Sequence, residues 1–446
     1  MSAVRAKLAD TFRSLRVRNY RLFATGNLLR LIGTWMMFVA QDWLVLQLSG
    51  DSATALGLVT ALQFLPILLL TLYGGKLADR YDKRKLLLLA NGAFAGLSLG
   101  LGVLATTGMV ELWHVFVFAG AIGTVSAIET PVRQSFVSEI VGYDLLPNAL
   151  SLSAATFNSA RIIGPALAGL AIALFDTGPV FLATASLGVA PLLALLRMRP
   201  EELHRAEPTA VAARDARIID GLRYVWHRPD LLLPIVLVLV IGMFGFNFQL
   251  TLAVLAKTTF HVSAKSFGLL TTALALGSLG GALAGTGRRA RPSVYIVLAG
   301  AVGFGVLETL VGFAPGFDSA LALLVPTGFF MIFFAQAANQ RVQLGTDAEL
   351  RGRVMALYVL VFLGTTPIGA PLIGWLAERY GPRSGIWVGG LISLLAAVLV
   401  AIVQVRRVDA QVRVHLRPLP HLHVHEPERN GTPARTLRVP AARRAA

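Results

Sequence analysis

Long apolar runs dominate this sequence and restrict what the chain can fold into. Twelve stretches of about 20 residues carry few charges, and most are separated by short segments with Gly, Pro, Asp or Arg. A helix of this length spans the hydrocarbon core of a bilayer. The runs cover residues 22–48, 53–77, 86–106, 112–130, 150–175, 180–196, 231–256, 267–284, 294–313, 321–338, 354–377 and 384–403. The sequence therefore predicts an all-α polytopic membrane protein with twelve transmembrane helices.

Composition and missing motifs exclude several other classes. Of the 446 residues 55% are apolar and only 14% are charged, whereas soluble domains carry about 25% charged residues. The chain has no cysteine, which excludes disulfides and cysteine metal sites. It also has no phosphate-binding Gly-x-x-x-x-Gly-Lys-[Ser/Thr] loop, no His-Glu-x-x-His and no Gly-x-Ser-x-Gly. We therefore expect neither an enzyme nor a metal or organic cofactor.

The basic residues predict the orientation. If the N-terminus is cytoplasmic, 34 of the 40 Lys and Arg residues fall in cytoplasmic segments, as the positive-inside rule requires. The net charge of +16 then faces anionic inner-leaflet lipids of the plasma membrane rather than a nucleic acid. Five segments follow: a cytoplasmic N-terminal segment (1–21), a six-helix bundle (22–196), a cytoplasmic central loop (197–230), a second six-helix bundle (231–403) and a basic, disordered cytoplasmic tail (404–446).

The two bundles resemble each other in sequence. A shift of 206 residues places Gly74-Gly75 on Gly280-Gly281, Arg133-Gln134 on Asn339-Gln340, and Pro165 on Pro371. An even number of helices in each unit makes both units start on the same side of the membrane. The chain is thus predicted to hold two parallel six-helix repeats with a cavity between them.

The loop between the second and third runs carries the most specific motif. Gly75-Lys76-Leu77-Ala78-Asp79-Arg80-Tyr81-Asp82-Lys83-Arg84-Lys85 resembles the major facilitator superfamily signature Gly-x-Leu-Ala-Asp-Arg-x-Gly-Arg-Lys, with Asp82 in place of the second Gly. We expect Gly75 to allow close helix approach and Asp79 to cap a neighbouring helix. With Arg80, Glu129 and Arg133 these residues would form a gating latch that biases the outward-open state.

The fifth run carries a second family motif. Gly164-Pro165-Ala166-Leu167-Ala168-Gly169 resembles the Gly-Pro-x-x-Gly-Gly motif of antiporters in this superfamily, with Ala168 replacing one Gly. Proline and small residues permit a kink and close packing. Together with Pro131-Val132-Arg133-Gln134, this segment resembles the branch of macrolide-efflux and enterobactin-export proteins. The resemblance implies a proton-driven exporter of drugs or siderophores.

Three acidic residues fall inside the runs, where a charge is costly and often functional. Asp42 is our candidate for proton coupling, with contact to the outer headgroups as the alternative. Glu129 lies one helical turn before Arg133, which predicts an ion pair that bridges to Asp79. The sequence assigns no role to Glu308 beyond packing or an outer-end ion pair.

Two arginines also fall inside the runs. Arg161 lies near the middle of its run and is expected to neutralise a carboxylate or to hold an anionic substrate group, whereas Arg30 either lines the cavity or reaches back to the interface. The other candidate cavity residues are polar side chains in the runs: Gln41, Gln63, Asn158, Asn247, Gln249, Gln336, Asn339 and Gln340.

His421, His423 and His425 alternate in the tail, but Pro-rich flanks favour disorder over a metal site. The sequence as a whole predicts a monomeric, proton-coupled exporter of amphipathic small molecules that works by alternating access. An importer or lipid translocator of the same fold, or a membrane sensor or scaffold that does not transport, are the alternatives.

Overall fold

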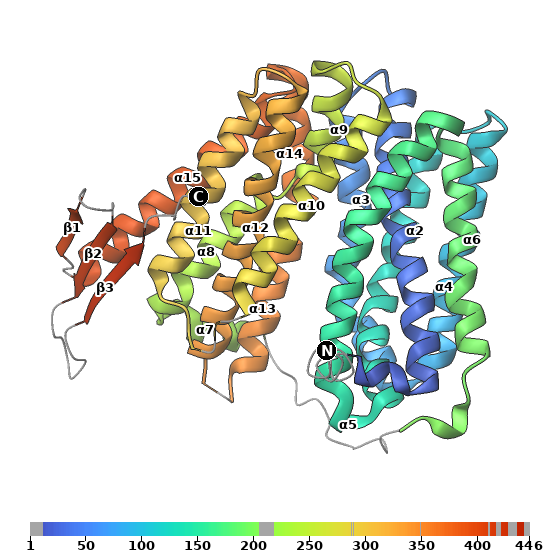
Figure 1. Cartoon of the computed structure of the whole chain (residues 1–446), viewed down its shortest axis with the longest axis horizontal. Coiled ribbons are helices and arrows are strands. Elements are labelled where there is room, and N and C mark those ends of the chain that lie inside the picture. The colour runs from blue at the N-terminus through green and yellow to red at the C-terminus, as the bar shows by residue number, and fades with distance from the viewer. Residues whose placement is uncertain are drawn as a thin grey trace, which may run out of the picture.

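Helices make up nearly all of the computed structural model, which describes residues 12–204, 218–286, 288, 290–347, 349–408, 411–415, 421–426 and 435–440. Figure 1 shows two helical bundles that stand side by side. The first bundle contains η1 (Arg13–Arg16), α2 (Arg18–Leu48), α3 (Ala53–Arg80), α4 (Lys83–Thr106), α5 (Leu112–Phe175) and α6 (Thr177–Leu196). The connection holds η2 (Pro200–Glu202) and α7 (Ile218–Trp226). The second bundle contains α8 (Pro229–Phe244), α9 (Phe248–Val254), the π-helical turn η3 (Leu255–Thr259), α10 (Ala264–Thr286), α11 (Val294–Gly312), α12 (Phe317–Gly345), α13 (Arg351–Gly364), α14 (Thr366–Tyr380) and α15 (Ser384–Val408).

Eleven helical segments of the described chain are long and apolar enough to cross a membrane. One of them, α5, has 64 residues and is interrupted at Gly142, whose φ of 69° and ψ of 176° are not helical. The two arms of α5 correspond to the two runs expected at 112–130 and 150–175. The count of twelve crossings and the cytoplasmic position of both termini stay predictions. Residues 1–11 of the expected N-terminal segment and 205–217 of the expected central loop lie outside the described residues.

Two runs expected as single helices are interrupted in the second bundle. The run 231–256 ends its first helix, α8, at Phe244, and α9 begins at Phe248. The run 354–377 is divided between α13 and α14, with Thr365 between them and Pro at the start of α14. Proline lacks the N–H that continues a helix, and Gly245 has no side chain to protect the backbone. A count of apolar residues alone does not detect such breaks.

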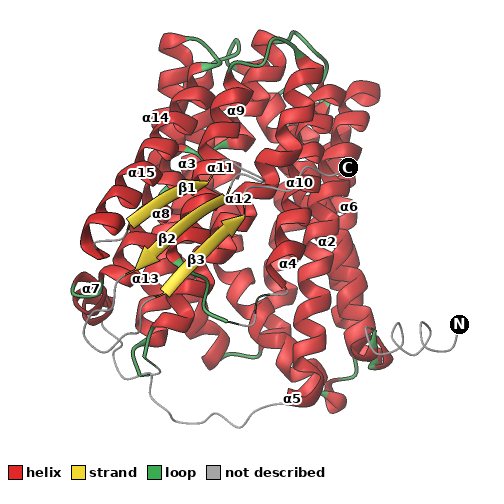
Figure 2. Cartoon of the chain, turned by 60° about the vertical axis from the view of Figure 1, so that its left-hand side comes forward, coloured by secondary structure: helices red, strands yellow, loops and turns green. Residues whose placement is uncertain are grey.

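The tail is described only in part. In it α15 continues to Val408, and the described residues beyond form strands β1 (Gln411–His415), β2 (His421–Glu426) and β3 (Arg435–Pro440). The rest of the tail expected to be disordered, 404–446, lies outside the described residues, and its disorder stays a prediction. Both neighbouring pairs are antiparallel, in the order β1-β2-β3, and Figure 2 shows the sheet beside the second bundle. Polar and apolar residues alternate in these segments, which is the strand pattern that the Pro-rich flanks obscured.

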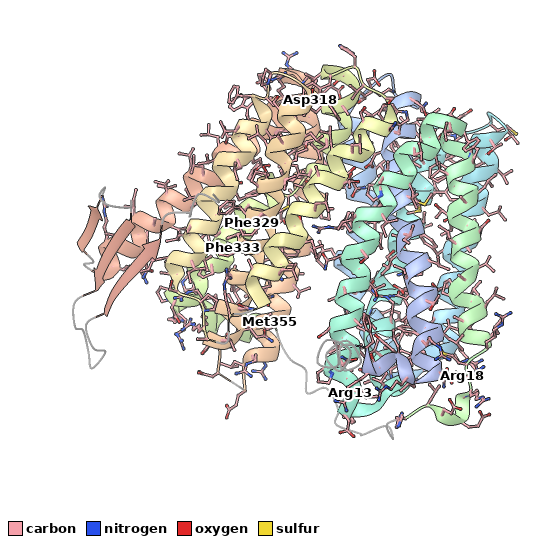
Figure 3. All side chains as sticks on the ribbon, in the orientation of Figure 1. Arg13, Arg18, Asp318, Phe329, Phe333 and Met355 are labelled. Carbon is pink, nitrogen blue, oxygen red and sulfur yellow. The ribbon has the colours of Figure 1, made fainter. Side chains whose placement is uncertain are left out.

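The two ends of the bundles differ in charge. Figure 3 shows Arg13 and Arg18 at one end of the first bundle and Asp318 at the opposite end of the molecule. We call the first of these the basic end; it is the predicted cytoplasmic side. We call the other the opposite end.

Backbones of the two bundles touch at small residues. A Cβ added to Gly268 of α10 would lie 2.5 Å from the carbonyl oxygen of Pro165, and one added to Gly57 of α3 would lie 2.6 Å from that of Ala370. Likewise, a Cβ on Gly374 would lie 2.4 Å from the carbonyl oxygen of Ala53. We call these three contacts the seam. Pro165 and Pro371, which are 206 residues apart, both lie at the seam and so fit the sequence repeat. The glycines that face them, Gly268 and Gly57, are 211 residues apart and do not fit it.

The seam predicts a specific effect of adding a side chain to Gly374. Because a Cβ there would collide with the backbone of Ala53, Gly374→Leu should force the bundles apart and expose this part of α3. A single cysteine at Ala53, which is buried in a chain with no other cysteine, should then react about tenfold faster with a thiol reagent. The matched control is Gly352→Leu, since a Cβ at Gly352 meets nothing within 4 Å. Equal rates in both variants would contradict the packing described for the seam.

Candidate functional site

A central pocket lies between the two bundles. Its lining comes from α2 and α5 of the first bundle and from α9, α10, α12 and the α8–α9 break of the second. The empty space of the pocket, including its open mouth, is about 700 Å³. The lining residues are Trp35, Phe38, Val39, Arg161, Pro165, Phe246, Phe248, Gln249, Phe267, Thr271, Leu274, Ala275 and Met331. Both halves therefore contribute to one largely apolar, aromatic site.

Arg161 is the charged residue of this lining. It lies on the second arm of α5, one turn before Pro165, and is half-buried. Among the described residues no acidic group or hydrogen-bond acceptor pairs with it, so the carboxylate partner considered from the sequence is not found there. Even a half-buried guanidinium without a counter-ion is costly at this depth, which favours an anionic group in the pocket.

Asp42 lies beside the pocket, on the same helix as Trp35, Phe38 and Val39. The side chain is 1% exposed. Its Oδ1 accepts a hydrogen bond of 3.5 Å from Nε2 of Gln249, across the two bundles, and its Oδ2 is buried without a partner. Asp42 thus joins the halves where they meet and is not placed among headgroup-facing residues.

Further polar contacts join the bundles at the opposite end. Lys257 pairs with Asp51 at 2.6 Å and lies over the ring of Trp43. Oε2 of Glu378 on α14 accepts from the hydroxyl of Ser52 and the backbone N–H of Thr54, both at 2.8 Å. These donors belong to the N-terminus of α3, where a carboxylate is favoured by the helix dipole. Together with the seam, these contacts close the opposite end of the pocket.

The predicted latch loop differs from expectation at two residues. A Cβ on Gly75 would meet nothing within 4 Å, whereas one on Gly74 would lie 2.5 Å from the carbonyl oxygen of Ala127. Gly74, not Gly75, therefore makes the close approach. Asp82, not Asp79, caps a helix, because its side chain accepts from the N–H of Lys85 at the start of α4. Asp79 and Arg80 are exposed, and the structure does not bring Asp79 to Glu129 or Arg133.

Glu129 forms a buried ion cluster inside the first bundle. Its carboxylate pairs with Arg133 at 3.0 Å, as predicted, and also with Arg30 at 2.8 Å, while Glu129 itself is 2% exposed. Arg30 therefore neither lines the central pocket nor reaches the interface. A small separate cavity beside the cluster is lined by Asn27 and Asn91, among others. Glu129 on α5 thus fixes α2 through Arg30, while Arg133 pairs with it from the same helix.

The antiporter-like motif on α5 serves two different contacts. A Cβ on Gly164 would lie 2.5 Å from Cβ of Trp35 within the first bundle, whereas Gly169 and Pro165 face α10 across the seam. The motif thus connects the wall of the pocket to the contact between the halves.

The remaining candidate cavity residues lie elsewhere. Gln41 donates to Gln63 at 2.9 Å inside the first bundle, and Asn158 and Asn247 each donate to a carbonyl one turn back on their own segments. Gln336, Asn339 and Gln340 on α12 are not among the lining residues of the central pocket. Of the polar candidates only Arg161 and Gln249 line it. The aromatic residues of the lining were missed, because an apolar run gives no signal that separates a pocket wall from a lipid-facing side.

Comparison with known proteins identifies the family. The family of transmembrane secretion effectors, a branch of the major facilitator superfamily, matches this chain over residues 9–432. The chain belongs to this family. It is 28% identical to the multidrug efflux pump Tap of Mycolicibacterium fortuitum over 84% of this chain and 94% of that protein. It is also 27% identical to the enterobactin exporter EntS of Shigella boydii serotype 18, over 74% and 79% respectively.

A third relative is matched over a shorter length. The staphyloferrin A transporter of Staphylococcus aureus is 27% identical, but the match covers 58% of this chain and 64% of that protein, which is less than two thirds of its length.

Solved structures confirm the fold. A bacterial homologue of the human lysosomal transporter Spinster, in an inward-facing and occupied conformation, superimposes with a TM-score of 0.69 at 13% identity, over 87% of this chain and 97% of that one. A D-xylose–proton symporter gives a TM-score of 0.66 at 14% identity, over 86% and 97%. The family match and this fold together identify a multi-pass membrane transporter of the major facilitator fold, as the sequence predicted.

The ion cluster predicts a large loss of stability when its carboxylate is neutralised. Glu129→Gln leaves two arginines beside each other in a buried site, which should cost about 3 kcal/mol. Arg30→Gln combined with Glu129→Gln should recover part of this loss, because one unpaired charge is removed. Thermal unfolding of the purified variants in detergent checks both effects. A double variant less stable than Glu129→Gln would contradict the pairing.

Proposed function

We propose that this transporter exports amphipathic small molecules in exchange for protons. The observation that carries the proposal is the central pocket, which is built by both halves and closed at the opposite end by the seam and the Lys257–Asp51 ion pair. If the pocket opens toward the basic end and that end is cytoplasmic, substrate would enter from the cytoplasm, as an exporter requires. Two relatives, the multidrug efflux pump Tap and the enterobactin exporter EntS, support this direction by their names.

Asp42 is the group that would link protons to the closing of the seam. Burying an ionised carboxylate without a cation is costly, so the closed seam favours neutral Asp42, and ionisation favours a state in which water reaches it. When Asp42 binds a proton from outside, the seam can close. When Asp42 then loses this proton through the adjacent pocket to the cytoplasm, the seam would open and the substrate would be released outside.

The lining also supports a substrate class. Five aromatic rings favour a compound with apolar or aromatic surface, and Arg161, unpaired among the described residues, favours an anionic group on that compound. Carboxylate-bearing or acidic phenolic compounds combine both features.

The remaining assignments follow from orientation and are also proposals. We place the protein in the plasma membrane as a monomer with both termini in the cytoplasm, and its basic loops on anionic lipids. Exposed Lys76, Arg80 and Lys85 at the basic end would attract anionic compounds as well as lipid.

Proton coupling through Asp42 predicts that removing its carboxylate makes efflux insensitive to the proton gradient. Asp42→Asn keeps the hydrogen bond acceptor for Gln249 but cannot ionise, so dye efflux from cells should fall at least tenfold and no longer respond to an uncoupler. Unchanged, uncoupler-sensitive efflux in Asp42→Asn would contradict this role. Uncoupler-sensitive accumulation rather than efflux would instead indicate an importer.

The proposed substrate class is tested at Arg161. Arg161→Gln should reduce efflux of carboxyfluorescein about tenfold while efflux of the cationic dye rhodamine 123 stays equal or rises, and Arg161→Lys should retain part of the carboxyfluorescein activity. Asn158→Ala, one turn earlier and outside the lining, is the control and should behave as the unmodified protein. A preference for rhodamine 123 in the unmodified protein would contradict an anionic substrate while leaving transport intact.

A further inference from the structure

Glu308 is a buried carboxylate that the proposed cycle does not use. It lies on α11, within the second bundle, and is 2% exposed. No described residue forms an ion pair or hydrogen bond with it, and its Oε2 is buried without a partner. An ionised carboxylate in such a place is costly, so a functional explanation is required.

Two glycines make room for this carboxyl group. A Cβ on Gly245, in the break between α8 and α9, would lie 3.0 Å from Oε2 of Glu308 and 2.8 Å from Oγ of Ser393. A Cβ on Gly389 of α15 would lie 3.3 Å from Oε1 of Glu308 and 2.4 Å from the carbonyl oxygen of Phe244. The carboxyl group thus occupies the space that side chains at these two positions would fill.

The helix break places a second negative group beside it. Phe244 is the last residue of α8, and the C-terminal end of a helix carries a partial negative charge from its free carbonyls. The break lies about midway along the span Pro229–Thr259, the depth at which interrupted helices bind protons or ions in transporters. The carboxyl group and this helix end repel each other unless a positive charge lies between them.

No charged side chain supplies that positive charge within the described residues. The charged residues of the packed helices lie near their ends: Asp230 on α8, Asp318 and Arg341 on α12, Arg406 and Arg407 on α15, and Arg383 just before α15, whose guanidinium binds the carbonyls of Gly312 and Ala314. The other groups that a Cβ at Gly245 would meet are the ring of Phe304 and the hydroxyl of Ser393, and this hydroxyl already donates to the carbonyl of Gly389.

We propose that Glu308 is a second proton-binding site, which controls the break between α8 and α9. A proton needs no shell of oxygen ligands, whereas a sodium ion would need several more than this apolar site provides. With the proton bound, the neutral acid allows α8 to end against α11 as observed. Without it, repulsion from the Phe244 carbonyl and entry of water would displace the break.

This site would communicate directly with the pocket. α9 begins three residues after Gly245 and carries Phe248, which lines the pocket, and Gln249, which bonds Asp42. A shift at the break would therefore move both. The proton site stands on this geometry alone, and only its consequence for transport rests on the proposed function.

Infrared difference spectroscopy of the purified full-length protein in lipid nanodiscs tests the site. Between acidic and alkaline buffer we expect a carbonyl-stretch band of a buried protonated carboxyl group that is lost in Glu308→Gln and kept in Asp42→Asn. Glu308→Gln preserves the volume and mimics the neutral acid, so it should fold. Glu308→Asp, which keeps a carboxyl group, should shift the band rather than remove it.

Two results would overturn the proposal. One is a spectrum in which Glu308→Gln changes no pH-dependent carboxyl band. The other is a Glu308 band that responds to sodium chloride but not to potassium chloride at constant pH, which would identify a sodium site instead. Neither result depends on whether any dye is transported, so the site and the export proposal fail independently.

Discussion

Backbone packing at small residues holds the two halves together at one end, and the rest of the site depends on it. The helices leave no space for side chains at three glycines: Gly268 packs against Pro165, Gly57 against α14, and Gly374 against α3. Lipid offers no hydrophobic drive for helices to associate, so close packing and polar contacts must supply it. The Lys257–Asp51 pair and the Glu378 cap on α3 add such contacts at the same end. These contacts close the pocket at the opposite end.

The charged groups within the bundles fall into two kinds. Glu129 is matched by Arg30 and Arg133, and this cluster fixes α2 to α5 within one half. Asp42, Arg161 and Glu308 have no such counter-charge among the described residues. Since an unpaired charge in a bilayer is costly, such groups are retained where a ligand or a proton can neutralise them. Their positions, at the seam, in the pocket and at a helix break, are those that would move in alternating access.

Composition and local spacing in the sequence predicted the membrane spans and an ion pair within one helix. Contacts between segments that are distant in the chain were not predicted. The apolar runs located the spans, and the spacing of Glu129 and Arg133 predicted their ion pair. The second partner, Arg30, is about a hundred residues away in the chain and gave no signal. The motif suggested Gly75 and Asp79, whereas Gly74 and Asp82 make the expected contacts, because helix phase decides which neighbour faces the partner. The aromatic lining and the break at Gly245 depend on tertiary packing and were not predictable.

Two distance measurements, one at the seam and one at the basic end, test whether the two ends open and close alternately. One spin-label pair at Leu58 and Leu372 would report on the seam, and another at Tyr143 and Leu344 on the basic end; all four side chains are exposed. Double electron–electron resonance in nanodiscs should show a short seam distance and a long basic-end distance at acidic pH. Ionisation at alkaline pH should lengthen the first and shorten the second. Two distances that stay constant, or that change in the same direction, would contradict the account.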